Sequence, residues 1–223
     1  MSELKGTSLV GGSVSRERVE NDYYATPPEA TRALLNSFGI YGCFNILEPA
    51  CGEGHISKEI VKWFNKTRDA EGNKWDDEEL VTSTDLIDRG YGTGGIDFLR
   101  MEENKKYDCV ITNPPFKLAK EFILKALKLS KKYVIMFAKI QLLEGIGRRE
   151  LFEKYPPKYI YVFRNRINPM RNGSSVDENG KKWSNTMCFA WFVWEIGFEG
   201  EPTIRWLQTN LLQKTAKASG DKK

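Results

Sequence analysis

The sequence has 223 residues, of which 40% are hydrophobic and 29% are charged, a composition typical of a globular protein with one sizeable core. No run of about 18 apolar residues is present, which argues against a membrane-spanning helix. The first 21 residues are polar and contain no hydrophobic signal segment. We therefore expect a cytoplasmic protein with no membrane partner. The net charge of +4 is compatible with a nucleic-acid partner without requiring one.

The four cysteines and the single histidine predict no metal site. Cys43, Cys51, Cys109 and Cys188 form no CxxC pair, and His55 stands at no spacing familiar from zinc sites. Cys51 and Cys109 lie in apolar or glycine-rich stretches. We expect them to be small buried residues and not metal ligands or disulfide partners.

The elements predicted from periodicity and turn signals alternate between strands and helices from residue 44 to residue 163. In chain order, we expect a helix over 27–38, a strand over 44–49, a helix over 55–65, strands over 80–85 and 107–112, a helix over 118–130, a strand over 133–137, a helix over 144–155 and strands over 159–163, 187–194 and 203–207. Such alternation predicts an α/β fold of Rossmann-like type, with a mostly parallel sheet and helices on both faces. The strand over 187–194 follows a long loop and is expected to be antiparallel.

The chain is expected to form one domain over 22–210. Residues 1–21 are expected to form a flexible arm, and residues 211–223 are expected to form a flexible basic tail. Thr26 is predicted to cap the first helix, with Glu29 completing a capping box. A long polar loop, 164–186, precedes the strand over 187–194.

A glycine turn at 50–54 follows the strand over 44–49 and opens a helix. In an open parallel sheet this is a place where ligands bind. Gly52 and Gly54 allow a ligand to approach the bare backbone. The turn lacks a third glycine, and Glu48 just before it would repel a phosphate but suit a cation, such as the sulfonium and amino group of S-adenosylmethionine. Taken alone, a two-glycine turn fits equally well with a second interpretation, in which it only connects a strand to a helix.

Two further acids strengthen this cofactor prediction. Asp85 ends the next strand and could accept hydrogen bonds from both ribose hydroxyls. Asp97 precedes Phe98 and could accept from the amino group of an adenine while the Phe98 ring packs on the base.

The most specific signal is the sequence NPPF at 113–116, directly after a strongly apolar strand. Pro114 and Pro115 fix the chain and remove two N–H donors. The side-chain oxygen of Asn113 and the carbonyl of Pro114 then form a pair of acceptors that fits an NH₂ group. Phe116 offers a flat face to the ring that bears this group.

These acceptors suit methylation of the adenine amino nitrogen. That nitrogen is a poor nucleophile because its lone pair is delocalised into the ring. Two acceptors that hold both hydrogens favour a tetrahedral nitrogen, whose lone pair can attack a methyl carbon in line. Positioning and acceptor electrostatics then carry the catalysis, and no separate general base is needed before transfer.

In combination, these motifs resemble class I N6-adenine DNA methyltransferases, especially the small enzymes of phages and prophages. The matching segments are DYYATP at 22–27, EPACGEG at 48–54, Asp85, Asp97-Phe98 and NPPF at 113–116. The resemblance implies S-adenosylmethionine as cofactor and a seven-stranded sheet with the last strand inserted antiparallel. It further implies that Tyr24, Thr26, Ala50 and Cys51 contribute to the cofactor site.

The expected partner is DNA, from which the target adenine must be flipped. The loop over 164–186 is the candidate for binding DNA, together with the segment that follows the strand over 133–137. The basic residues assigned to this role are Arg148, Arg149, Arg164, Arg166, Arg171, Lys181 and Lys182. No separate recognition domain fits in the remaining sequence.

The same acceptor pair would also hold adenine in RNA or a protein glutamine amide. A catalytically silent nucleic-acid-binding module with the same fold is an alternative of another class. The sequence leaves the target site, the oligomeric state, for which a monomer is favoured, and the biological role open; restriction protection and marking of phage DNA both fit.

Overall fold

The computed structural model describes residues 23–68, 77–104, 106–171, 173–176, 179–181 and 187–209. The expected arm over 1–21 and tail over 211–223 therefore lie outside the described residues, as does Lys182.

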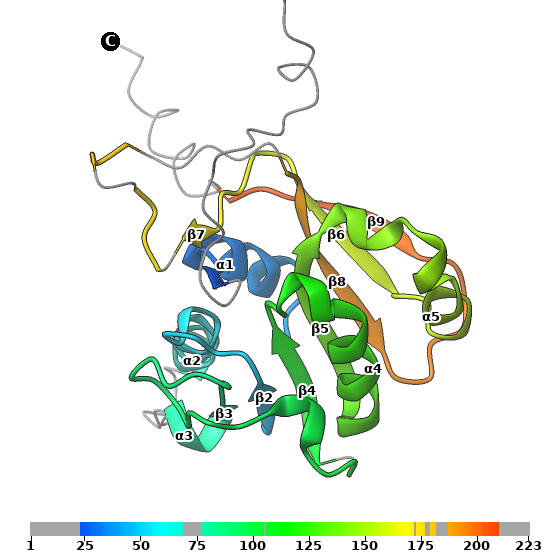
Figure 1. The fold of residues 1–223 in the computed structure, drawn as a ribbon, viewed down its shortest axis with the longest axis horizontal. Helices are drawn as coiled ribbons and strands as arrows, with labels where there is room; N and C mark the ends of the chain where they lie inside the picture. Colours follow the sequence, from blue (N-terminus) through cyan, green and yellow to red (C-terminus); the bar gives the residue numbers. More distant parts are fainter. Residues whose placement is uncertain are drawn as a thin grey trace, which may run out of the picture.

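A seven-stranded mixed sheet forms the centre of the molecule (Figure 1). Its strands are β2 (Ile46–Glu48), β3 (Val81–Ser83), β4 (Tyr107–Thr112), β5 (Ser130–Lys139), β6 (Tyr159–Phe163), β8 (Phe189–Glu195) and β9 (Thr203–Leu207). The order is β3-β2-β4-β5-β8-β6-β9. Neighbours among β3, β2, β4 and β5 are parallel, whereas β8 lies antiparallel between β5 and β6. The predicted α/β fold is confirmed, including the antiparallel strand that follows the long loop; β9 comes later in the chain and runs parallel to β6.

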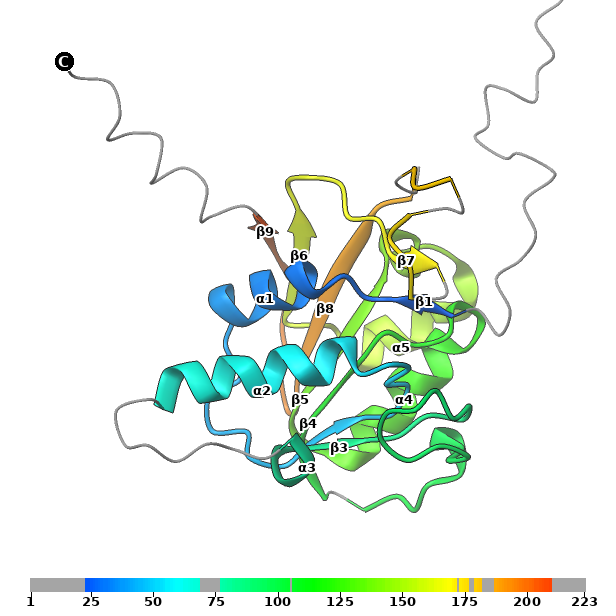
Figure 2. The same ribbon diagram turned by 90° about the vertical axis from the view of Figure 1, so that its left-hand side faces the viewer.

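Helices cover both faces of this sheet (Figures 1 and 2). The helices are α1 (Pro28–Ser37), α2 (His55–Arg68), α3 (Asp77–Leu80), α4 (Ala119–Leu129) and α5 (Arg149–Lys154). Side chains of α1 and α2 pack with one set of alternating strand residues, and those of α4 and α5 with the other. Within the described ranges, no helix is long and apolar enough to cross a membrane.

Two tryptophans of β8 tie the sheet to a helical layer on each face. Trp191 is fully buried, and its Nε1 donates to the carbonyl of Ala30 in α1 at 3.0 Å. Trp194 faces the other way, and its Nε1 donates to the carbonyl of Tyr155 after α5 at 2.9 Å. These two hydrogen bonds fix where each layer sits.

A short second sheet lies at the carboxyl edge of the parallel strands. Here β1 (Tyr24–Ala25) pairs antiparallel with β7 (Met170–Arg171). The strand β7 belongs to the segment predicted as an irregular loop. Its pairing brings Tyr24 beside Arg171 and Ala25 beside Met170, so this part of the long loop is anchored beside β1 (Figure 2).

Two local predictions are wrong. The N-cap of α1 is Pro27 and makes no side-chain cap bond, so Thr26 and Glu29 form no capping box. Thr26 lies in the wall of a pocket instead. The helix predicted over 144–155 begins only at Arg149, after the 3₁₀ turn η6 (Ile146–Arg148). Gly145 has a φ of 98°, which a right-handed helix cannot include.

We expect Trp191→Phe to lower the free energy of unfolding by about 1–3 kcal/mol, because it removes a buried hydrogen bond and part of a fully buried side chain. Trp206 on β9 is 60% exposed and serves as the matched control. Trp206→Phe should change stability by no more than about 0.5 kcal/mol. Denaturant unfolding of the two variants tests this, and equal losses would contradict it.

Candidate active site

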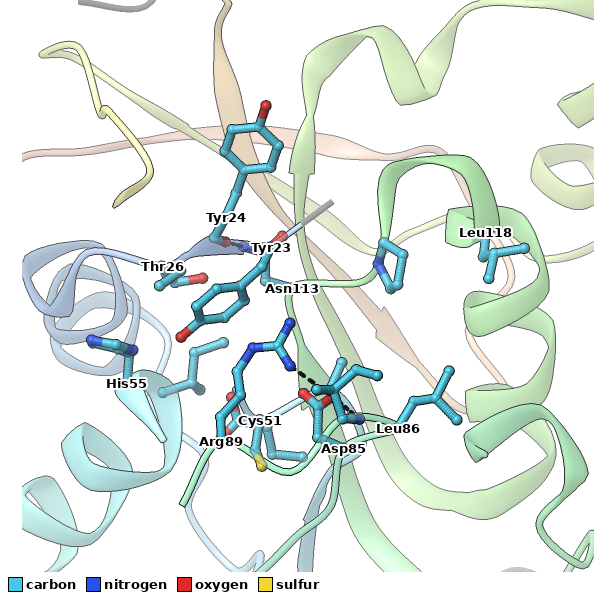
Figure 3. Close-up of a pocket in the computed structure, with 16 residues that line it drawn as sticks. Tyr23, Tyr24, Thr26, Cys51, His55, Asp85, Leu86, Arg89, Asn113 and Leu118 are labelled. Carbon is cyan, nitrogen blue, oxygen red and sulfur yellow. Dashed lines mark hydrogen bonds and ion pairs between the residues drawn. The ribbon is translucent and has the colours of Figure 1, made fainter. Parts of the chain in front are cut away.

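A pocket of about 230 Å³ lies beyond the carboxyl ends of β2, β3 and β4 (Figure 3). This is the edge where open parallel sheets bind ligands. Eight predicted site residues line it: Tyr24, Thr26, Glu48, Ala50, Cys51, Asp85, Asn113 and Pro115. Six others are not among its lining residues: Gly52, Gly54, Asp97, Phe98, Pro114 and Phe116. The chain thus brings the glycine turn, the acid after β3 and the NPPF turn to one place.

Glu48 is a buried carboxyl group in the pocket wall. It is 1% exposed, and its Oε2 accepts from the backbone N–H of Ser57 at 2.9 Å and from the Ser57 hydroxyl. Burial raises the pKa of Glu48 to about 8, although both Ser57 bonds act in the opposite direction. Without a ligand, the carboxyl group is therefore largely protonated at neutral pH, and a nearby cation would favour its ionised form.

Asp85 supports the glycine turn as well as facing the pocket. Its Oδ2 accepts from the N–H of Gly52 at 2.8 Å, and its Oδ1 accepts from the N–H of Ile87 at 2.9 Å. The guanidinium of Arg89 lies 3.9 Å from the same Oδ1. This carboxylate therefore fixes the loop after β3 against the turn after β2.

Tyr23 and Arg89 lie across the pocket between Thr26 and Asp85 (Figure 3). The Arg89 guanidinium stacks 4.3 Å from the centre of the Tyr23 ring. Tyr23 also hydrogen-bonds through its hydroxyl group to the backbone N–H and the carboxylate of Glu53, both at 3.2 Å. Sequence reasoning assigned neither residue: Tyr23 belongs to the matched DYYATP segment, whereas an arginine in a glycine-rich loop resembles an ordinary surface residue.

Tyrosine rings cover the bare faces of both glycines in the turn. A Cβ on Gly52 would lie 2.5 Å from the ring of Tyr23, and one on Gly54 would collide with the ring of Tyr91. Both glycines also have positive φ, 55° and 77°. Packing within the protein thus already requires glycine here, so the two glycines do not by themselves indicate a ligand.

Asn113 has its orientation fixed by the backbone of β1. Its Nδ2 donates to the carbonyl oxygen of Tyr24 at 2.5 Å. A carbonyl can only accept, so the amide nitrogen must face Tyr24 and the Oδ1 atom must face the other way. Asn113 lines the pocket, and its side-chain oxygen is therefore held as an acceptor at the site.

Three other polar side-chain atoms of pocket-lining residues are buried without a hydrogen-bond partner among the described residues: the Thr26 Oγ1, the His55 Nδ1 and the Arg89 Nη1. Arg89 still has an ion-pair partner, because its Nη1 lies 3.9 Å from the Asp85 Oδ1. Thr26 is 2% exposed, so its hydroxyl group has little contact with solvent. Buried polar groups are nearly always satisfied in native proteins. These unsatisfied atoms therefore favour a polar ligand in this pocket.

Cys51 also lines the pocket, as a buried thiol without a disulfide. Burial raises the pKa of Cys51 to about 12, with the neighbouring Glu48 and Asp85 acting in the same direction. The group is thus a neutral thiol at neutral pH and a poor nucleophile.

Phe116 has an aromatic ring on one side and a cation at its face. It stacks on Tyr24 with 5.2 Å between ring centres, and the ammonium group of Lys139 lies 3.7 Å from its ring centre. By contrast, Phe98 is buried against Phe122 with 4.8 Å between ring centres. Asp97 caps the 3₁₀ turn η3 (Phe98–Arg100) by accepting from the N–H of Leu99 at 3.0 Å. The adenine contacts assigned to Asp97 and Phe98 stay predictions.

The basic residues assigned to DNA differ in their surroundings. Arg164, Arg166 and Lys181 are exposed, and Arg171 lies in β7. Arg148 donates to the carbonyls of Gln141, Leu142 and Glu144, and it therefore holds the loop after β5 together. Arg149 pairs with Glu153 on the surface of α5.

The long loop returns to the glycine turn. Gly173 has a φ of 74°, and a Cβ at this position would collide with the carboxylate of Glu53. Together with the β1–β7 pairing, this contact places Met170, Arg171 and Gly173 at the rim of the candidate site. The exposed residues Arg164 and Arg166 precede this anchored part.

The protonation of Glu48 predicts a pH effect on stability. In the folded protein its pKa is about 8, against 4.5 for the free side chain. The unfolded chain therefore binds fewer protons between these values, and the contribution of Glu48 to stability falls as pH rises through this window. Relative to Glu48→Gln, which carries no such proton, the wild-type protein should lose stability between pH 5 and pH 8. A stability difference that is independent of pH in denaturant unfolding would contradict this.

Comparison with known proteins supports the fold. No family model matches the sequence, and a search of curated proteins gave no match. Among solved structures, a Listeria monocytogenes protein described as a class I S-adenosylmethionine-dependent methyltransferase has a TM-score of 0.57. The match has 15% identity and covers 95% of this chain and 72% of that one. A Pyrococcus horikoshii protein described as an RNA methyltransferase has a TM-score of 0.53 at 16% identity over 86% of this chain and 95% of that one.

A type I restriction-modification methyltransferase subunit from Streptococcus thermophilus has a TM-score of 0.54 at 11% identity. The match covers 83% of this chain but only 47% of that one, so the chain spans about half the length of this subunit. At such identities the likeness shows the fold alone. The chain has the Rossmann-like fold of class I methyltransferases, with a seven-stranded mixed sheet.

Proposed function

We propose that this protein transfers a methyl group from S-adenosylmethionine to the N6 amino group of adenine in DNA. The observation that carries the proposal is the orientation of Asn113. Its amide nitrogen is held by the Tyr24 carbonyl, so its side-chain oxygen is presented as an acceptor in the wall of the pocket. An acceptor held at this position suits a substrate with an NH₂ group.

The pocket fits S-adenosylmethionine in its chemistry. Glu48 would face the positively charged part of the cofactor, whose presence would favour loss of the Glu48 proton. Asp85 would accept from the ribose hydroxyls, and the buried Thr26 hydroxyl would bond the polar methionine end. When bound, the cofactor supplies an electrophilic methyl group on a sulfonium.

On the substrate side, Asn113 and Pro114 would hold the adenine amino group. The Asn113 Oδ1 and the Pro114 carbonyl accept its two hydrogens, and they localise the nitrogen lone pair. Catalysis then comes from positioning and from fixed acceptor dipoles. Direct transfer without an enzyme-bound thioether agrees with the neutral state of the Cys51 thiol.

The exposed basic loop beside the pocket supports a nucleic-acid substrate. Arg164 and Arg166 are exposed on the loop that β7 anchors next to Tyr24. A base that is flipped out of a nucleic acid could reach Asn113 while the phosphate backbone of that nucleic acid contacts these two arginines. Adenine in RNA and a protein glutamine amide present the same NH₂ group and are the alternatives to be tested in parallel.

The first test is transfer of tritiated methyl groups to DNA, RNA and a mixture of proteins under identical conditions. The proposal predicts label in DNA, recovered as N6-methyladenine after hydrolysis. Label confined to RNA or to glutamine would overturn the choice of substrate. Absence of transfer to any of the three, with cofactor bound, would favour the silent binding module.

Asn113→Ala should lower methyl transfer by about a hundredfold or more, because it removes one of two fixed dipoles at the reacting nitrogen. Cofactor affinity should be nearly unchanged. Asn45→Ala is the matched control, since Asn45 also donates its side-chain amide to a backbone carbonyl, that of Lys106, away from the pocket. Near-normal turnover of Asn113→Ala would reject the assigned role.

Asp85→Ala should weaken S-adenosylmethionine binding by about tenfold to a hundredfold, as expected for loss of charged hydrogen bonds. Asp88→Ala provides the control, because Asp88 lies in the same loop, accepts from the N–H of Gly90 and does not line the pocket. Calorimetry measures both dissociation constants. An unchanged value for Asp85→Ala would reject the ribose assignment.

A further inference from the structure

A second pocket, of about 380 Å³, adjoins the NPPF turn. Its walls come from the NPPF turn, the first turn of α4, the end of β5 and the loop after β5. Its lining includes Pro114, Phe116, Lys117, Lys120, Lys139 and Arg148.

The NPPF turn separates this pocket from the candidate cofactor pocket. Asn113 and Pro115 line the first pocket, whereas Pro114 and Phe116 line the second. A substrate that presents its amino group to both Asn113 and Pro114 therefore lies where the two pockets meet. The part of the substrate behind the reacting group extends on the side of Phe116.

The second pocket is strongly basic. Three lysines and Arg148 line it, with Glu121 as its acidic residue. Lys120 donates to the carbonyl of Gly147 at 2.6 Å, so it braces α4 against the loop after β5. Lys117 is exposed at the rim, and the uncapped first turn of α4 adds a favourable field for an anion.

Contacts of the Phe116 ring indicate which of its faces a base can use. The ring of Tyr24 lies only 5.2 Å away, centre to centre, and a base between them would need about 7 Å, or two stacking contacts. The ammonium group of Lys139 lies 3.7 Å from the Phe116 ring centre. An ammonium on a flexible stem can move aside, whereas Tyr24 is held by its backbone pairing with β7.

We propose that this second pocket holds the sugar–phosphate of the nucleotide being methylated, with Lys117 and Lys139 as its phosphate contacts. The proposal rests on the proposed function. The entering base displaces the Lys139 ammonium from the face of Phe116, and the ammonium then meets the phosphate that follows the base into the pocket. Lys139 thereby exchanges an aromatic contact for an ion pair and favours a base that carries a phosphate.

The test compares an oligonucleotide that the wild-type protein methylates with the same oligonucleotide carrying a neutral methylphosphonate in place of one phosphate next to the target adenine. With the wild-type protein, the substitution on one side of the adenine should raise KM roughly tenfold and leave kcat nearly unchanged. With Lys117→Gln/Lys139→Gln, KM should already be raised by a similar factor, and the methylphosphonate should add little.

Lys131→Gln is the matched control, because Lys131 is an exposed lysine near the opposite end of the same strand, β5. It should retain the wild-type response to the methylphosphonate. An equal loss in the wild-type protein and the double variant would show that the phosphate is held elsewhere and would overturn the proposal. No loss with methylphosphonates on either side would do the same.

Failure of the proposed function would look different. In that case the wild-type protein would methylate no oligonucleotide at all, whether or not it binds the cofactor or labels protein. The pocket assignment alone fails if oligonucleotides are methylated but substitution of both lysines leaves KM unchanged. A circular dichroism spectrum and unfolding midpoint equal to those of wild type show that the variants are folded.

Discussion

The hydrogen bond from the Asn113 side chain to the Tyr24 carbonyl joins the two halves of the candidate site. It fixes the acceptor atom of the NPPF turn, and it attaches that turn to β1. The same strand pairs with β7 of the long loop. One backbone segment, 24–25, is therefore shared by the candidate cofactor pocket, the proposed acceptor pair of Asn113 and Pro114, and the anchored part of the long loop. Displacement of this segment would change all three at once.

Charge divides the surroundings of the NPPF turn into two regions. Glu48 and Asp85 line the pocket on one side, where burial holds Glu48 largely protonated until a cation is present. Lysines line the pocket on the other side. A cationic methyl donor would favour ionisation of Glu48 on one side, and an anionic nucleotide would meet the lysines on the other side, with the reacting atoms between them.

The sequence predicted the elements whose signals are local. The bounds of β4, β6 and β9 match the predicted ranges, since each is a short run of strand-forming residues between clear turn signals. It could not predict the β1–β7 pairing, because two-residue strands far apart in the chain carry no periodicity. Thr26 was assigned to a helix cap from local spacing alone, although it was also assigned to the cofactor site. Arg89 was missed because its role depends on Tyr23 and Asp85, which only the fold brings close.

The central claim is that Asn113 and Pro114 grip the amino group of an adenine. A crystal structure of the protein with a non-reactive S-adenosylmethionine analogue and an adenine-containing oligonucleotide measures this directly. The account predicts the adenine amino nitrogen within about 3.2 Å of both the Asn113 Oδ1 and the Pro114 carbonyl oxygen. An amino nitrogen bound elsewhere, or an Asn113 oxygen turned toward protein, would contradict it.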